Sequence, residues 1–144
     1  MTVGTRSDVL EAAESWVGTP FHDGASIKGV GVDCAMLLRA VYFEAGVTPL
    51  IEVASYPPQW YMHRNEELFL SYLTPIATEI PAGRAADGDV ALFKFGRCFA
   101  HGAILVEAPR KVIHATPNYR SVTYGEIDMG ELAGRETRYF TFWP

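Results

Sequence analysis

The segment from Cys34 to Ala45 constrains the fold more than any other part of the sequence, because it is apolar on nearly every side of a helix. Asp33 can cap its N-terminus and Gly46 can end it. Between those ends, only Arg39 and Glu44 are charged. A helix that is apolar all round is buried, and this one is too short for a bilayer, which takes about 20 residues. The segment therefore predicts a central helix that other elements cover.

Helical patterns come first along the chain, and strand patterns follow. Apolar side chains at helical spacing predict a helix over 7–17, capped by Ser7 or Asp8, and another over 65–73. Beyond Gly83, alternating and β-branched runs predict strands over 90–95, 99–106, 112–115, 121–124 and 139–143. This order predicts an α+β fold in which an antiparallel sheet packs on the central helix. We find no internal repeat or low-complexity linker, which favours one domain over residues 1–144.

Length and charge exclude several classes of partner. The chain has 144 residues, of which 49% are hydrophobic, so it is long enough to bury a core. Its net charge is −5 and it contains no run of Lys or Arg, so we expect no nucleic-acid partner and no membrane anchor. The N-terminal residues lack the continuous apolar core of a signal peptide, so we expect synthesis in the cytoplasm.

Cys34 stands in the first turn of the predicted central helix, where free backbone N–H groups and the helix dipole stabilise negative charge. The position predicts a lowered pKa for the Cys34 thiol, and the thiolate is the nucleophilic form. A buried, inert thiol is the alternative, because free cysteine is among the most buried residue types. Together with Cys98, the chain could carry one disulfide, two buried thiols, or one reactive and one buried thiol.

His101 and His114 lie on neighbouring predicted strands joined by a tight connection near residues 107–109. If paired residue numbers sum to 215, the two side chains are directly opposed, and if they sum to 217 they are diagonal neighbours on the same face. A turn centred on Ala108 would put them on opposite faces. Two histidines on one face favour a site in which His101 is the base for Cys34 and His114 orients it.

With these residues, the sequence resembles the NlpC family of papain-like cell-wall cysteine peptidases. The similar segments are Gly18–Phe21, Gly31–Cys34, Asp87–Phe93, His101–Val106 and Val112–Ala115. The resemblance implies a papain-like fold with Cys34 as nucleophile, His101 as base and His114 as orienting residue, and no cofactor. It also implies hydrolysis of γ-D-glutamyl or neighbouring amide bonds in peptidoglycan stem peptides. In such enzymes, the residue at Asp33 often helps to bind the free amine of the substrate.

The sequence departs from the family pattern beside the nucleophile. Phe21 stands where the family usually has Tyr, and Ala35-Met36 where it usually has Ser-Gly. Two hydroxyls are thereby removed from the expected cleft, which leaves the substrate preference open. Phe21, Asp33 and Ala35 are the candidate substrate-binding residues.

The segment 56–67 lies outside the general family pattern and resembles the versions encoded with phage tail modules and gene-transfer agents. That resemblance implies phage-like tail proteins as partners and delivery to the cell wall as part of a tail. His63 and Trp60 in this segment could line a groove or form a satellite core. His22, in the glycine-rich loop, could contact substrate or be an ordinary polar loop residue.

Zinc binding and two further function classes are the alternatives to a cysteine peptidase. Zinc could use Cys34, Cys98, His101 and His114, but no two of them have a usual ligand spacing, so we expect no metal. We expect Cys98 to be a buried thiol. Two further function classes stay open: an acyltransferase, thioesterase or amidase on the same fold, and a tail component that binds peptidoglycan with little catalysis.

Overall fold

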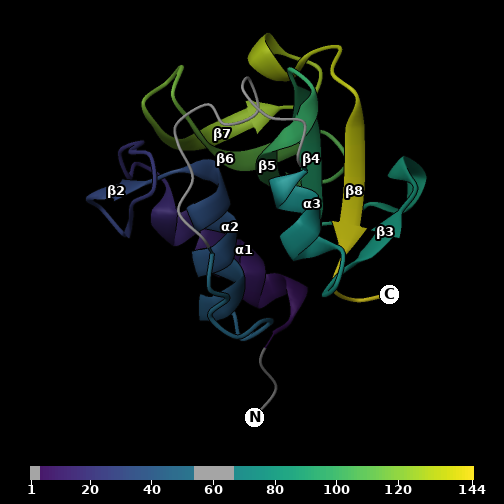
Figure 1. Ribbon diagram of the computed structural model, residues 1–144. Coiled ribbons are helices and arrows are strands. Elements are labelled where there is room, and N and C mark those ends of the chain that lie inside the picture. Colours follow the sequence, from purple (N-terminus) through teal and green to yellow (C-terminus); the bar gives the residue numbers. More distant parts are fainter. Residues whose placement is uncertain (1–3, 54–66) are drawn as a thin grey trace.

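The computed structural model describes residues 4–53 and 67–144 and has helices on one side of an antiparallel sheet (Figure 1). The six-stranded sheet has the order β3-β8-β4-β5-β6-β7, and β1 and β2 form a small separate hairpin. The α+β fold predicted from the sequence is confirmed. The helices are α1 (Arg6–Trp16), α2 (Cys34–Glu44) and α3 (Leu68–Leu73). The strands are β1 (Ser26–Ile27), β2 (Gly31–Val32), β3 (Thr78–Ile80), β4 (Val90–Phe95), β5 (Cys98–Glu107), β6 (Lys111–Thr116), β7 (Ser121–Glu126) and β8 (Thr137–Thr141).

Helix α2 is the buried centre of the fold, as its composition predicts. It packs against α1 on one side and against β5 and β6 on the other. Asp33 caps it, with the side chain accepting a hydrogen bond from the backbone N–H of Met36 at 2.9 Å. Leu37 and Val41 are fully buried, and Tyr42 donates a hydrogen bond to the carbonyl of Gly88 at 2.6 Å. The helix therefore fixes Cys34, its first residue, relative to the sheet.

The N-cap of helix α1 lies two or three residues before Ser7 or Asp8. Thr5 is the cap, because its hydroxyl accepts from the N–H of Asp8 at 3.1 Å while the Asp8 carboxylate accepts from the N–H of Thr5 at 3.0 Å. This reciprocal capping box satisfies two free donors at once, which a cap at Ser7 would not do. The predicted cap was therefore wrong. Thr5 caps the helix, and Asp8, three residues later, is the partner of Thr5 in the capping box.

The five predicted strands lie within two residues of their predicted bounds, and α1 and α2 lie within one residue of theirs. Helix α3 begins at Leu68, and the start of the helix predicted over 65–73 lies outside the described residues. The hairpin β1–β2 and the strand β3 were not predicted, because two or three residues are too few to show alternation. Short 3-10 helices occur at Ala82–Arg84 (η2) and Gly130–Leu132 (η3). Over the two described ranges, no helix has the length and apolar character needed to cross a bilayer.

Two irregularities in the sheet flank the segment that carries His101. Between β4 and β5, Phe93 pairs with His101 but Lys94 pairs with Phe99, so Ala100 is an extra residue. Between β5 and β6, Ile104 pairs with Ile113, which is the register with residue numbers summing to 217. That register is one of the two that place His101 and His114 on the same sheet face, so the shared face is confirmed.

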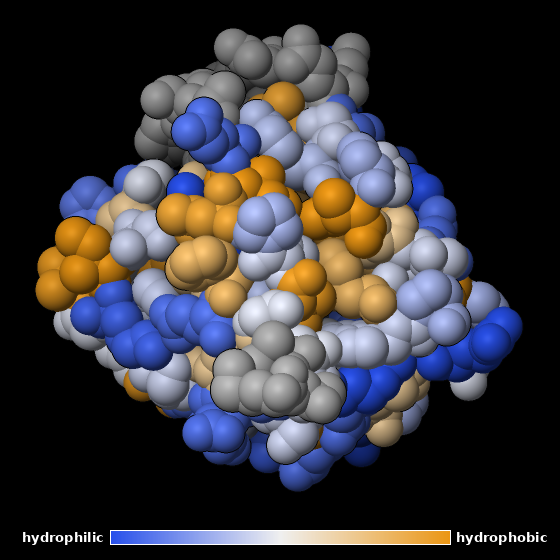
Figure 2. Space-filling view, turned by 90° about the horizontal axis from the view of Figure 1, so that it is seen from below, coloured by the Kyte–Doolittle hydropathy of each residue, from blue (hydrophilic) through white to orange (hydrophobic). Residues whose placement is uncertain are grey.

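Both faces of the sheet are covered by apolar side chains. Leu92 and Ile104 belong to the core cluster that includes α1 and α2. Phe93 and Leu105 alternate with them and pack in a second cluster with Leu132 of η3. The face at the bottom of Figure 1 shows apolar side chains near its centre with hydrophilic ones around them (Figure 2). The two histidines thus come from strands that are buried on both sides.

Candidate active site

Cys34 lies against the backbone of the strand segment that carries His101. Its Sγ is 3.7 Å from the carbonyl oxygen of Ala100, to which the thiol donates, and the backbone N–H of Gly102 also faces the sulfur. The pairing of β5 with β6 begins at Ile104, so the sulfur lies where the two strands part. In the part of the chain that the structure describes, no hydrogen bond joins this thiol to an imidazole. The thiol must turn from Ala100 to reach His101.

The predicted lowering of the Cys34 pKa is wrong. Burial is the larger cause and the Asp33 carboxylate the smaller one, and together they raise the pKa of this thiol to about 12. The N–H groups of Gly102, Ala35 and Cys34 itself act in the opposite direction, as the helix N-terminus predicts. Desolvation disfavours the charged form more strongly than these donors favour it. At rest, Cys34 is a neutral thiol.

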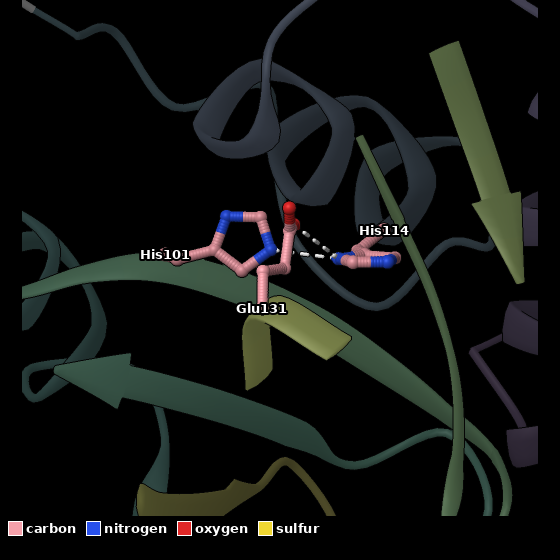
Figure 3. A group of neighbouring side chains, drawn as sticks. All are labelled: His101, His114 and Glu131. Carbon is pink, nitrogen blue, oxygen red and sulfur yellow. Dashed lines mark hydrogen bonds and ion pairs between the residues drawn. The ribbon is translucent and has the colours of Figure 1, made fainter. Parts of the chain in front are cut away.

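His101 and His114 form a hydrogen-bonded pair (Figure 3). The Nε2 atom of His101 is 2.8 Å from the Nδ1 atom of His114, and the two ring planes are nearly perpendicular. Their exposed fractions are 7% and 2%, so the pair is shielded from water. Burial lowers the pKa of both imidazoles well below the usual value, and for His101 the charges of His114 and Arg135 lower the pKa further. Both rings are neutral near pH 7.

The short contact between the two rings holds one proton between Nε2 of His101 and Nδ1 of His114, and the tautomer decides which ring carries it. Figure 3 shows that Nδ1 of His101 points away from His114, so this nitrogen is left to accept a proton. In the tautomer that leaves Nδ1 of His101 bare, this ring carries its proton on Nε2 and donates it to Nδ1 of His114. His114 then carries its own proton on Nε2, which lies against Gly125 of β7. A Cβ on Gly125 would come within 2.7 Å of that atom, so glycine lets β7 approach the ring.

Glu131 is a member of the site that the sequence reasoning missed. Its Oε1 atom is 4.0 Å from Nδ1 of His114, and Figure 3 shows the carboxylate directed toward the pair from η3. The carboxylate accepts hydrogen bonds from Thr116 Oγ1, at 2.6 Å, and from Asn118 Nδ2. Glu131 lies in an irregular segment with no periodicity or motif, so no sequence signal indicated it.

The His101–His114–Glu131 group has metal-ligating side chains but hydrogen-bonding geometry. One ligand atom from each residue lies within 4.8 Å of the others. Two imidazole nitrogens bound at 2.0–2.1 Å to a tetrahedral zinc would be about 3.3 Å apart. The observed 2.8 Å is shorter and matches an N–H···N hydrogen bond. The group does not include Cys34 or Cys98, so the zinc set considered from the sequence is not assembled.

The three candidate substrate-binding residues surround the N-terminus of α2. Asp33 is 3% exposed, and its Oδ2 atom accepts from the N–H of Gly24 at 2.7 Å while Oδ1 caps the helix. Its carboxylate thus ties the glycine-rich loop to α2, and binding of a substrate amine stays a prediction. Phe21 is half-buried against the core, and its N–H donates to the carbonyl of Arg120 at 2.8 Å. Ala35 follows the nucleophile in the first turn and is half-buried.

The remaining residues singled out in the sequence fall outside this group. Cys98 is a fully buried thiol, so its predicted burial is confirmed, and no disulfide joins it to Cys34. His22 is exposed, with its ring 3.4 Å from the carbonyl of Asp23. His63 and Trp60 lie outside the described residues.

No family model and no curated protein matches the sequence. Solved structures match its fold. The NlpC/p60 domain of the peptidoglycan hydrolase SagA is 19% identical with a TM-score of 0.64, over 93% of this chain and 97% of that one. The peptidoglycan hydrolase RipB from Mycobacterium tuberculosis is 17% identical with a TM-score of 0.65, over 95% of this chain and 64% of that one. RipD from the same organism, described as a non-catalytic NlpC/p60 protein adapted to peptidoglycan binding, is 15% identical with a TM-score of 0.59, over 94% of this chain and 95% of that one. The papain-like fold of NlpC/p60 domains, expected from the sequence, is confirmed.

Proposed function

We propose that this protein is a cysteine peptidase that hydrolyses amide bonds in the stem peptides of peptidoglycan. One observation carries the proposal: the Cys34 thiol lies beside the strand of His101, whose Nε2 is held by His114 while Nδ1 remains available. The fold shared with SagA and RipB, both described as peptidoglycan hydrolases, supports the substrate class. As a finer assignment, we propose the γ-D-glutamyl bond as the one cleaved.

The first half of the reaction forms a thioester. The thiol turns from Ala100 toward Nδ1 of His101 and transfers its proton as the sulfur attacks the amide carbon. The resulting oxyanion accepts hydrogen bonds from free N–H groups in the first turn of α2. The imidazolium of His101 then gives its proton to the leaving amine as the carbon–nitrogen bond breaks. The acyl group stays on Cys34.

The second half restores the enzyme. His101 accepts a proton from a water molecule whose oxygen attacks the thioester carbon, and the carbon–sulfur bond breaks. The sulfur takes the proton back, and a free carboxylate leaves. Because the resting thiol and both rings are neutral, charge separates only during the attack. His114 keeps the His101 ring in the productive tautomer through both halves.

Incubation with defined muropeptides tests this proposal. We expect products with one new amine and one new carboxylate at a stem-peptide bond, identified by mass, and none from the Cys34→Ser variant. Cleavage between the glycan and the peptide would instead indicate an amidase, and acyl transfer to an added amine or alcohol would indicate a transferase. Intact muropeptides after prolonged incubation with the folded protein would contradict a peptidase.

A binding protein without catalysis is the second candidate. The observations that favour it are the neutral resting thiol and its hydrogen bond to Ala100 instead of His101. RipD, which shares the fold, is described as non-catalytic. This candidate predicts that wild-type protein and Cys34→Ser bind muropeptides with equal affinity and that neither cleaves them.

We further propose that phage-like tail proteins are the partners that deliver the enzyme to the wall. The support is the resemblance of residues 56–67 to versions encoded with tail modules, a segment of which only Glu67 is among the described residues. Purified tail particles from the source cells are the test. Their peptide masses should include this chain, and its absence from tails that are otherwise complete would contradict this delivery route.

A further inference from the structure

Glu131 places a negative charge beside the histidine pair, and the mechanism above does not use it. Its side chain is 12% exposed, and its Oε1 atom is 4.0 Å from Nδ1 of His114. The distance is too long for a hydrogen bond, so Glu131 acts on the ring through its charge. Because water is largely excluded from the pair, that charge is weakly screened.

The partners of the carboxylate are neutral. Thr116 donates at 2.6 Å and is itself fully buried, and Asn118 donates from its amide. The backbone N–H of Asn118 in turn donates to Thr116 Oγ1 at 3.2 Å, which fixes this β6–β7 connection around the carboxylate. Among the described residues, the basic side chain within 4 Å of the Glu131 carboxylate is His114, which forms an ion pair with it when protonated. The negative charge is therefore positioned without being cancelled by Lys or Arg.

A positive charge lies near the His101 ring. The guanidinium of Arg135 lies 3.4 Å from the centroid of the Phe95 ring, which is 5.3 Å from the His101 ring. Arg135 donates to the carbonyls of Lys94 and Glu131, at 3.0 and 2.5 Å, and so is held in place by backbone. The charge of Arg135 disfavours the protonated form of His101. One fixed anion thus lies near His114 and one fixed cation near His101.

We propose that Glu131 is a positioning residue that stabilises the imidazolium formed when His101 takes the proton of Cys34, and that Arg135 opposes it. As His101 becomes charged, its Nε2–H donates more strongly to Nδ1 of His114, and positive charge spreads toward Glu131. Without the carboxylate, two buried rings facing Arg135 would resist protonation. The inference rests on the proposed function, because it concerns the proton transfer of that reaction.

Two charge-removing variants with opposite expected effects test the inference. Glu131→Gln keeps an oxygen that accepts from Thr116 and removes the charge. We expect kcat to fall about tenfold with KM unchanged, which corresponds to a loss of about one unit in the pKa of the His101 imidazolium. Arg135→Gln should raise the rate of Cys34 alkylation by iodoacetamide at pH 7, whereas Glu131→Gln should lower it, each by about tenfold. The mass of the Cys34 peptide separates its reaction from that of Cys98. Glu11→Gln, an exposed change on α1, is the matched control and should leave both rates unchanged.

The alkylation rates separate failure of this inference from failure of the proposed function. If the wild type cleaves no muropeptide, the peptidase proposal fails. The role of Glu131 is still supported if Cys34 is alkylated faster in Arg135→Gln than in wild type and more slowly in Glu131→Gln. If Glu131→Gln is folded and alkylates and cleaves within twofold of wild type, the inference is overturned. The same holds if both charge variants move the alkylation rate in one direction, since a merely structural effect does not follow the sign of the charge. Should Glu131→Gln not fold, Arg135→Gln decides alone, and an alkylation rate of Cys34 no higher than wild type overturns the inference.

Discussion

At Cys34, two physical effects that a sequence cannot weigh act in opposite directions. The sequence predicts the helix N-terminus and its donors, and the structure confirms that the N–H groups of Cys34 and Ala35 favour the thiolate. The packing of α2 against β5 buries the sulfur and raises its pKa to about 12. Burial depends on what covers the helix end, and that information is spread over the whole chain.

The first prediction concerns how the alkylation rate of this thiol depends on pH. Because the pKa of Cys34 is raised, its thiolate fraction near pH 8 is at least about a hundredfold below that of an ordinary thiol. The alkylation rate of the Cys34 peptide should therefore keep rising above pH 9. A rate that reaches its plateau below pH 7 would mean that a thiolate–imidazolium ion pair already exists at rest.

The second prediction concerns the contact between β7 and His114. Gly125→Ala places a Cβ 2.7 Å from Nε2 of His114, so the ring or the strand must shift. We expect a loss of about 1–3 kcal/mol in the free energy of unfolding and a lower kcat, because the shift disturbs the bond to His101. Gly83→Ala is the matched control, since a Cβ there meets nothing within 4 Å. Equal stabilities of the two variants in urea would show that β7 does not hold the ring.

At the scale of elements, period-two alternation predicted the histidine pair but not the bulge that places both histidines on the same face of the sheet. The tight turn pairs Glu107 with Lys111, and a regular ladder continued from that pair would put His101 and His114 on opposite faces. The extra residue Val106 shifts the register to the one that unites them. A bulge has no alternation of its own, so the sequence left both outcomes open. The strands β4 to β8 were predictable because each is long enough to alternate, whereas β1, β2 and β3 are not.

The third prediction concerns Asp33, which both caps α2 and raises the pKa of Cys34. Asp33→Asn keeps a good cap and removes the charge, so we expect little loss of stability and faster alkylation of Cys34 at pH 8. Asp33→Ala removes the bonds to Met36 and Gly24 as well and should cost about 1–2 kcal/mol more in urea unfolding. If Asn slows alkylation, the carboxylate does not oppose the thiolate as described.

At the scale of the whole molecule, the site is assembled from parts of the chain that the sequence relates to different extents. Cys34, His101 and His114 lie in regular elements with readable patterns, and they were predicted. Glu131 and Arg135 come from the irregular connection between β7 and β8 and reach the pair only through the closed sheet. Such contacts depend on tertiary packing, and no local pattern encodes them.

The fourth prediction is the pH dependence of stability. The folded-state pKa values of His101 and His114 are lowered, so below about pH 6.5 the unfolded chain binds more protons and stability falls as pH falls, by up to about 1.4 kcal/mol per pH unit for each ring. The pKa of Cys34 is raised, so stability also falls as pH rises above 9. Urea unfolding between pH 4 and 10 should give a maximum near pH 7–8, with a shallower acid limb in His114→Gln. An acid limb unchanged by His114→Gln would show that His114 is not buried neutral.

The most direct test of the central claim is to trap the acyl-enzyme on Cys34. Wild-type protein mixed with a cleavable muropeptide and quenched in acid should gain the mass of the acyl half of the peptide, located on the fragment that contains Cys34. Cys34→Ala should show neither the mass gain nor cleavage. Cleavage by Cys34→Ala at the wild-type rate, with no thioester in either protein, would contradict nucleophilic catalysis by Cys34.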